Sequence, residues 1–124
     1  MQKVTLVTGL LNAALVVGIG AFGAHALKAC ITSYQLDVLQ VGIRYHMFHA
    51  LGLIFVALIM YRVGASTLLT WSALLLMAGI VLFSGSLYGI AFTGIRALGM
   101  ISPFGGTAFI VGWILAAIAV LRGP

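Results

Sequence analysis

Four long apolar runs, separated by shorter stretches with polar and charged residues, make up most of the chain. The runs are residues 4–27, 43–61, 67–93 and 103–121. A helix rises about 1.5 Å per residue, so each run is long enough to cross the roughly 30 Å hydrocarbon core of a bilayer. The pattern predicts an all-α protein, a four-transmembrane-helix up-down bundle that forms a single integral membrane domain over residues 1–124.

The stretch between the first two runs, residues 28–42, is the most polar part of the chain. Thr32 and Gln35 have the spacing of a capping box, which favours the start of a helix. Apolar residues then recur at helical spacing, with polar residues between them. We expect a short interfacial helix here, between the first and second transmembrane helices, with a disordered loop as the alternative.

Composition agrees with insertion into a membrane. Of the 124 residues, 64% are hydrophobic and 6% are charged, with a mean hydropathy of +1.28, whereas a soluble domain is typically about a quarter charged. The first run follows Lys3, as in a signal peptide, but no small-residue cleavage site ends a short core. We therefore expect a retained span. Cys30 is the only cysteine, which excludes an internal disulfide.

The net charge of +5 does not indicate nucleic-acid binding, because the cations stand singly between apolar runs. They are Lys3, Lys28, Arg44, Arg62, Arg96 and Arg122. An even number of spans puts both termini on one side, and the cations then divide equally between the two faces. Asp37, the only acid, lies on the face away from the termini and favours cytoplasmic termini.

The up-down topology gathers most of the polar side chains in one half of the bundle. The candidate ligand-binding residues there are His25, Arg44, Tyr45, His49, Ser84, Ser86 and Tyr88. A polar residue inside a span is a functional candidate by default. Three interpretations of His49 stay open: a hydrogen bond that fixes helix register, a contact to a ligand, and a ligand to a metal or haem together with His25 or His46.

Catalytic and transport chemistry find little support in the same residues. Ser84 or Ser86 beside His49 is conceivable as a nucleophile and base, but no carboxylate is present to orient the imidazole. A proton-coupled cation exporter needs an intramembrane carboxylate, and Asp37 lies outside the four runs. We expect no catalytic residue, no metal site and no cofactor.

Four motifs, in order along nearly the whole chain, resemble the YgdD-like family of small membrane proteins. They are Gly20-Ala-Phe-Gly-Ala-His25, Tyr45-x-x-Phe48-His49-Ala-Leu-Gly52, Leu82-Phe-Ser-Gly-Ser-Leu-Tyr88 and Pro103-x-Gly-Gly106-x-x-Phe109-x-x-Gly112-Trp113. The resemblance implies four transmembrane helices, a bacterial inner-membrane location with related forms in mitochondria, and no established activity. The matched positions include most of the candidates above, and Gly106. His46 stands where that family usually has glutamine.

The sequence thus predicts a multi-pass inner-membrane protein without catalytic activity of its own. We expect an accessory protein, or one that binds a lipid headgroup or other small amphiphile in its polar half. A metal- or haem-binding membrane enzyme and a small transporter are the alternatives. The expected partners are membrane lipid and either a second copy or another membrane protein, with no nucleic acid.

Overall fold

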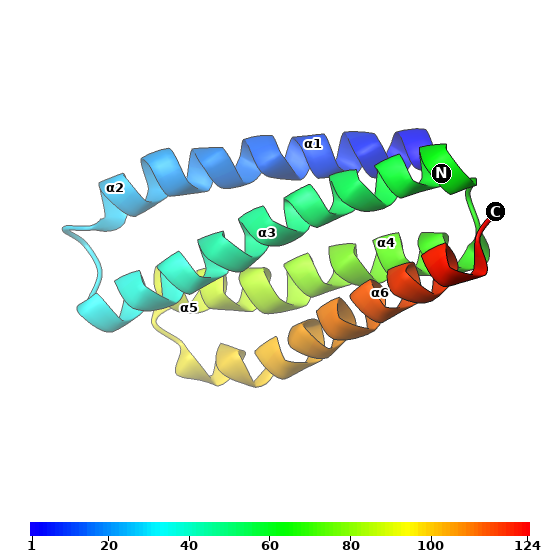
Figure 1. Cartoon of the computed structure of the whole chain (residues 1–124). Helices are drawn as coiled ribbons and strands as arrows, with labels where there is room; N and C mark the ends of the chain where they lie inside the picture. The colour runs from blue at the N-terminus through cyan, green and yellow to red at the C-terminus, as the bar shows by residue number, and fades with distance from the viewer.

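The computed structural model describes residues 1–124, except for the side chain of Ala24. Four long helices run side by side, and both chain termini lie at the same end of the bundle (Figure 1). All four helices are long and apolar enough to cross a membrane. The fold is therefore the predicted up-down bundle. The four spans are Gln2–Leu27, Ser33–Val63, Thr67–Thr93 and Arg96–Arg122.

Three of the four spans change helix type along their length. The first span comprises α1 (Gln2–Gly18), the π-helical turn η1 (Ile19–Gly23) and α2 (Ala24–Leu27). The third comprises α4 (Thr67–Gly79), the π-helical turn η2 (Ile80–Ser84) and α5 (Gly85–Thr93). The fourth comprises the 3-10 turn η3 (Arg96–Met100) and α6 (Ser102–Arg122). A π-helical turn shifts the faces that the residues on either side present. In η2, the shift falls at Phe83 and Ser84, which both contact other helices.

The second span is a single helix, α3 (Ser33–Val63). The expected capping box is present, with the Thr32 hydroxyl accepting from the Gln35 backbone N–H and the Gln35 side chain accepting from the Thr32 N–H. The prediction of a separate interfacial helix was wrong, because the helix that starts at Ser33 continues unbroken into the second span. No proline interrupts it, and Gly42 is buried where a Cβ would lie 3.0 Å from the Tyr88 ring. At about 46 Å, α3 exceeds the hydrocarbon thickness.

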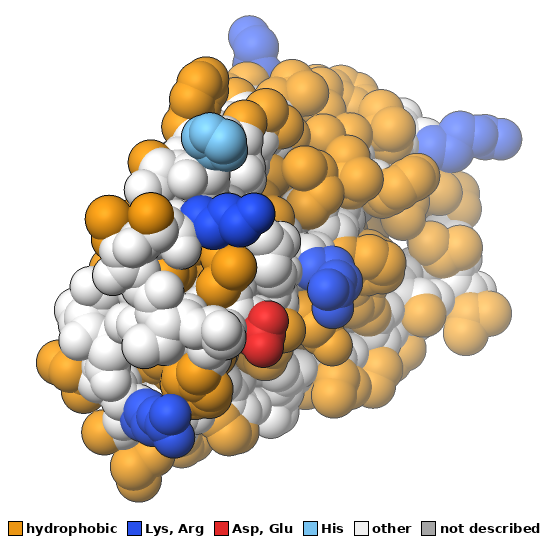
Figure 2. Space-filling view, turned by 90° about the vertical axis from the view of Figure 1, so that its left-hand side faces the viewer, with side chains coloured by type: hydrophobic (Ala, Val, Ile, Leu, Met, Phe, Trp, Pro, Cys, Tyr) orange, Lys and Arg blue, Asp and Glu red, His pale blue; other side chains and the backbone are white. Residues whose placement is uncertain are grey.

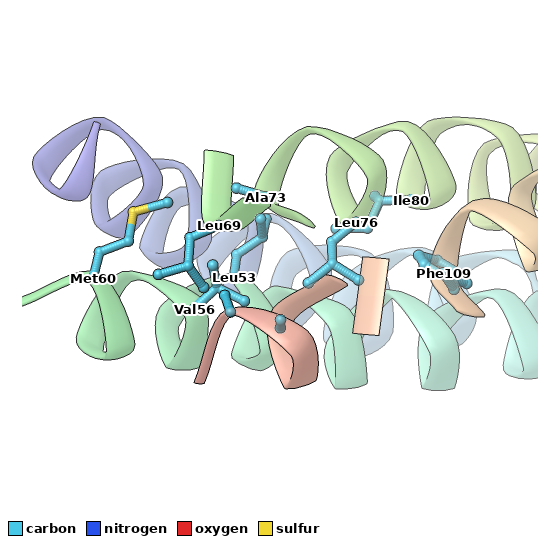
Figure 3. Packing of buried hydrophobic residues seen from close by; sticks show 10 residues of the cluster. Leu53, Val56, Met60, Leu69, Ala73, Leu76, Ile80 and Phe109 are labelled. Atoms are coloured by element: carbon cyan, nitrogen blue, oxygen red, sulfur yellow. The ribbon is translucent and has the colours of Figure 1, made fainter. Parts of the chain in front are cut away.

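The helices pack as two pairs, α1 on α3 and α4 on α6, and α3 also packs on α5 and η2. Gly9 allows the close approach of α1, since a Cβ there would lie 2.8 Å from Cγ1 of Ile54. Leucine, valine and methionine side chains from α3 and α4, together with alanines of α6, fill the half of the bundle near the termini (Figure 3). Apart from Thr5 and Ser72, the buried polar side chains lie outside this cluster, toward the other half.

The end of the bundle away from the termini carries basic side chains and the single acidic one (Figure 2). Here the Arg96 guanidinium lies 4.0 Å from the centre of the Tyr34 ring, a cation–π contact that ties the start of the fourth span to the start of α3. Beyond this contact, the backbones of α3 and α6 approach each other closely at few positions, and aromatic side chains bridge them. The seam between α3 and α6 is consequently open along part of its length.

Candidate ligand-binding groove

A groove of about 580 Å³ lies between α3, η2 and α6, in the polar half of the bundle. Its walls combine one cation and one imidazole with four aromatic rings. The lining residues are Arg44, Tyr45, Phe48, His49, Phe83, Gly106, Phe109 and Ile110. Three of the seven predicted site residues, Arg44, Tyr45 and His49, are thus brought together at one hollow.

His49 is the most enclosed polar group of the groove, with 3% of its surface exposed. Its Nδ1 lies 2.7 Å from the Tyr45 carbonyl oxygen. A carbonyl oxygen can only accept, so Nδ1 carries the proton and, in the neutral ring, Nε2 carries a lone pair. Nε2 makes no hydrogen bond to any residue that the structure describes.

Nε2 lies in the accessible part of the His49 side chain. Among the described residues, every fully enclosed side-chain nitrogen and oxygen has a hydrogen-bond partner. Since Nε2 has none, it belongs to the small part of His49 that stays accessible, and His49 lines the groove. The floor of the groove therefore presents an unpartnered acceptor.

Aromatic packing holds the imidazole in this orientation. The Phe109 ring stacks on it with centroids 3.4 Å apart and planes 7° from parallel. Phe109 is itself fixed by Gly79, where any Cβ would overlap its ring. Gly105 plays the same part for η2, since a Cβ there would overlap the backbone of Phe83. Glycine at these positions brings α6 close enough to form the aromatic wall.

Arg44 and Tyr45 lie at the outer end of the groove. Both side chains are exposed, and the Tyr45 ring contacts Phe83 with centroids 4.6 Å apart. Asp37, the only acid, lies seven positions before Arg44, or about 10 Å along the helix. The guanidinium charge is therefore free to attract an anionic group to this end of the groove.

His46 and Tyr88 lie outside the groove, in a hydrogen-bonded chain that crosses three helices. The Tyr88 hydroxyl is 2.8 Å from Nδ1 of His46, and Nε2 of His46 is 3.0 Å from Oδ1 of Asn12. The Asn12 amide nitrogen donates to the Thr8 carbonyl at 2.9 Å. This orients Oδ1 as the acceptor, so Nε2 of His46 donates and Nδ1 accepts from Tyr88. Each partner in the chain thus has a defined role.

The remaining candidates do not line the groove either. Ser84 donates to the Gly42 carbonyl at 2.9 Å, and Ser86 shares a 2.7 Å hydrogen bond with the Ser102 hydroxyl. Both hydroxyls therefore tie helices together. His25 is exposed on α2. No three His, Cys, Asp or Glu side chains of the described residues lie close enough together to hold a metal ion. Both ring nitrogens of His46 are engaged by Tyr88 and Asn12.

Three residues that shape the site, Asn12, Phe83 and Phe109, were not among the predicted site residues. A signal existed for Asn12, which is the only asparagine of the chain and stands inside an apolar run. A polar amide at such a place predicts an interhelical hydrogen bond. The two phenylalanines fall within the quoted motifs, but an apolar ring there does not by itself indicate a binding site, because aromatic residues are common on every face of a membrane helix.

Fold and groove together define a polytopic helical membrane protein with a half-enclosed hollow between its helices. The family model for DUF423, a protein of unknown function, matches residues 19–106. The UPF0382 membrane protein YwdK of Bacillus subtilis is 47% identical over 121 residues, 98% of each chain. UPF0382 membrane proteins of Staphylococcus epidermidis and Staphylococcus saprophyticus are each 43% identical over 98% of this chain and 98% and 99% of theirs. The chain belongs to this DUF423 family of membrane proteins. No solved structure matches it.

Proposed function

We propose that this protein binds a small amphiphile or lipid in the groove between α3 and α6, and has no catalytic activity of its own. One observation carries the proposal: a nine-tenths buried imidazole, held by aromatic packing, turns an unpartnered Nε2 into a hollow that has a cation at its outer end. Nε2 is accessible only through a largely apolar groove, where a polar atom without a hydrogen-bond partner is unfavourable. A ligand group would complete the pairing.

The position of the groove along α3 favours a membrane lipid over a water-soluble ligand. Arg44 and Arg62 lie eighteen positions apart, or about 27 Å along the helix, which approximates the hydrocarbon thickness. Arg44 then lies near one headgroup layer, and His49 lies about 7 Å deeper, among the acyl chains. The groove opens beside exposed apolar side chains such as Phe48 and Ile110. A ligand entering from the lipid phase meets no polar barrier.

The groove has the composition of a binding site. Its lining contains no carboxylate, cysteine or serine, and Tyr45 is its only hydroxyl. The proposal also includes kinship with the YgdD-like proteins and a location in the plasma membrane, the inner membrane where there are two. Helical spans support this location, since bacterial outer-membrane proteins are typically closed barrels. Cytoplasmic termini complete the proposed arrangement.

Native mass spectrometry of the protein released from detergent tests the binding. We expect the wild-type chain to retain a lipid, and the R44Q and H49F variants to retain much less. R62Q, which removes a cation at the other end of α3, is the matched control and should retain as much as wild type. A wild-type chain without retained lipid, or equal retention by all variants, would contradict the proposal.

A further inference from the structure

The direction of the hydrogen bonds at His49 determines what kind of ligand the groove accepts. Because Nδ1 donates to the Tyr45 carbonyl, Nε2 of the neutral ring can only accept. A ligand atom at this point must therefore carry a proton to donate. Ester and ether oxygens, which only accept, leave Nε2 unpaired and are penalised there.

The order of the groups along the groove adds a second constraint. Arg44 attracts an anion, and His49 lies five positions, or about 7 Å, further into the membrane along α3. The donor must accordingly lie between the anionic group and the apolar part of the ligand. In a lipid with a glycerol headgroup, the free hydroxyls lie beyond the phosphate, toward water. With the phosphate at Arg44, they would point away from His49.

The seam continues as an apolar hollow beyond Trp113. A second groove, of about 540 Å³, is lined by Ile59 of α3 and by Trp113, Ala116, Ala117, Val120 and Leu121 of α6. Ile59 lies ten positions, or about 15 Å, beyond His49. Trp113 separates the two hollows, with its ring centroid 6.0 Å from both Phe48 and His49. A single extended hydrocarbon chain would lie along this line.

We infer that the groove selects a monoacyl glycerophosphate, with the phosphate at Arg44, a free glycerol hydroxyl donating to Nε2 of His49, and the acyl chain along the α3–α6 seam past Trp113. The inference rests on the proposed function and narrows its ligand class. A diacyl phospholipid has an ester in place of the hydroxyl and offers only acceptors at this depth. The groove therefore distinguishes a monoacyl from a diacyl lipid by the hydroxyl proton that only the monoacyl lipid can donate to Nε2.

The test compares matched probes on the wild-type protein by native mass spectrometry titration in detergent. The probes are 1-oleoyl-glycerol 3-phosphate, its 2-O-methyl ether, its 2-deoxy analogue, and inorganic phosphate alone. Loss of one hydrogen bond to the Nε2 acceptor inside the groove predicts about tenfold weaker binding of both the ether and the deoxy analogue. The ether keeps the oxygen but has no proton to donate, and the deoxy analogue lacks the hydroxyl without adding bulk. If both bind more weakly to the same extent, the donated proton is the cause. Inorganic phosphate should not bind measurably.

The variant H49F checks the assignment, because phenylalanine keeps a flat ring against Phe109 but offers no acceptor. It should bind the three oleoyl probes equally, whereas H25F, which replaces the exposed histidine of α2, should discriminate as wild type does. Equal binding of all three probes to wild type, with dependence on Arg44, would overturn the inference and leave the proposed function standing. Absence of binding by every oleoyl probe would overturn the inference, and absence of any retained lipid on the wild-type protein as well would overturn the proposed function. The analogue series uses the unaltered chain, so it does not depend on the folding of a variant.

Discussion

Replacement of His46 tests whether the hydrogen-bonded chain from Tyr88 to Asn12 holds the first helix to the bundle. In H46F a ring stays in place, 2% exposed in the wild type, but both hydrogen bonds are lost. Asn12 Oδ1 is then left in an apolar interface without a donor. Interhelical hydrogen bonds in membranes average about 0.6 kcal/mol and reach about 1.7 kcal/mol. Loss of both hydrogen bonds should therefore lower the free energy of unfolding by about 1–3 kcal/mol.

Glutamine at the same position should restore most of this stability. Its amide nitrogen can donate to Asn12 and its amide oxygen can accept from Tyr88, which reproduces the polarity of the neutral imidazole. We expect H46Q to lose less than about 1 kcal/mol, below the value for two broken bonds. The resemblance noted above, in which glutamine is usual at this position, fits the same polarity.

Reversible unfolding in mixed micelles of increasing denaturing-detergent fraction, followed by tryptophan fluorescence, measures both variants. H25F is the control, since His25 is exposed and should be replaced without effect. If H46F is as stable as the wild-type protein, the hydrogen bonds from Tyr88 through His46 to Asn12 contribute nothing to helix association. A loss in H46Q as large as that in H46F would show that ring shape, and not the direction of the bonds, matters at this site.

Two glycine substitutions probe the packing around the groove and the tight turn. G79A places a Cβ into the Phe109 ring and should destabilise the protein by about 1–3 kcal/mol in the same unfolding assay. The control G18A, which has open space around its Cβ, should be close to neutral. Equal effects of the two substitutions would refute the packing assigned to Gly79. G64A puts a side chain at φ +93° in the turn after α3 and should lower stability by about 1–2 kcal/mol, and an unchanged midpoint would contradict the strain assigned to that turn. Its neighbour Ala65 offers the matched control, A65G, with an expected change of a few tenths of a kcal/mol.

Hydropathy predicted the four spans because lipid as a solvent permits few alternatives to helices that satisfy their own backbone. It failed at the boundary between residues 28–42 and the second span. A drop in hydropathy marks a change of environment, but it does not break a helix unless the backbone is also interrupted. The two π-helical turns, Ile19–Gly23 and Ile80–Ser84, were not predicted either, since hydropathy does not distinguish a π-helical turn from an α-helical one.

The site was predictable only as far as polar atoms stand out in an apolar sequence. Arg44, Tyr45 and His49 were found in this way, and the groove brings them together. The same signal selected Ser84 and Tyr88, whose polar atoms are bonded to other helices. Sequence alone does not distinguish a polar atom that pairs within the protein from one that faces a ligand. The difference arises from side-chain direction, which only packing determines.

A cryo-electron microscopy map of the protein in lipid nanodiscs gives the most direct test of the ligand-binding groove. We expect elongated density that begins at the Arg44 guanidinium, passes within hydrogen-bond distance of Nε2 of His49 and continues along the α3–α6 seam. A groove filled by protein side chains, with Nε2 of His49 bonded to another residue of this chain, would contradict it.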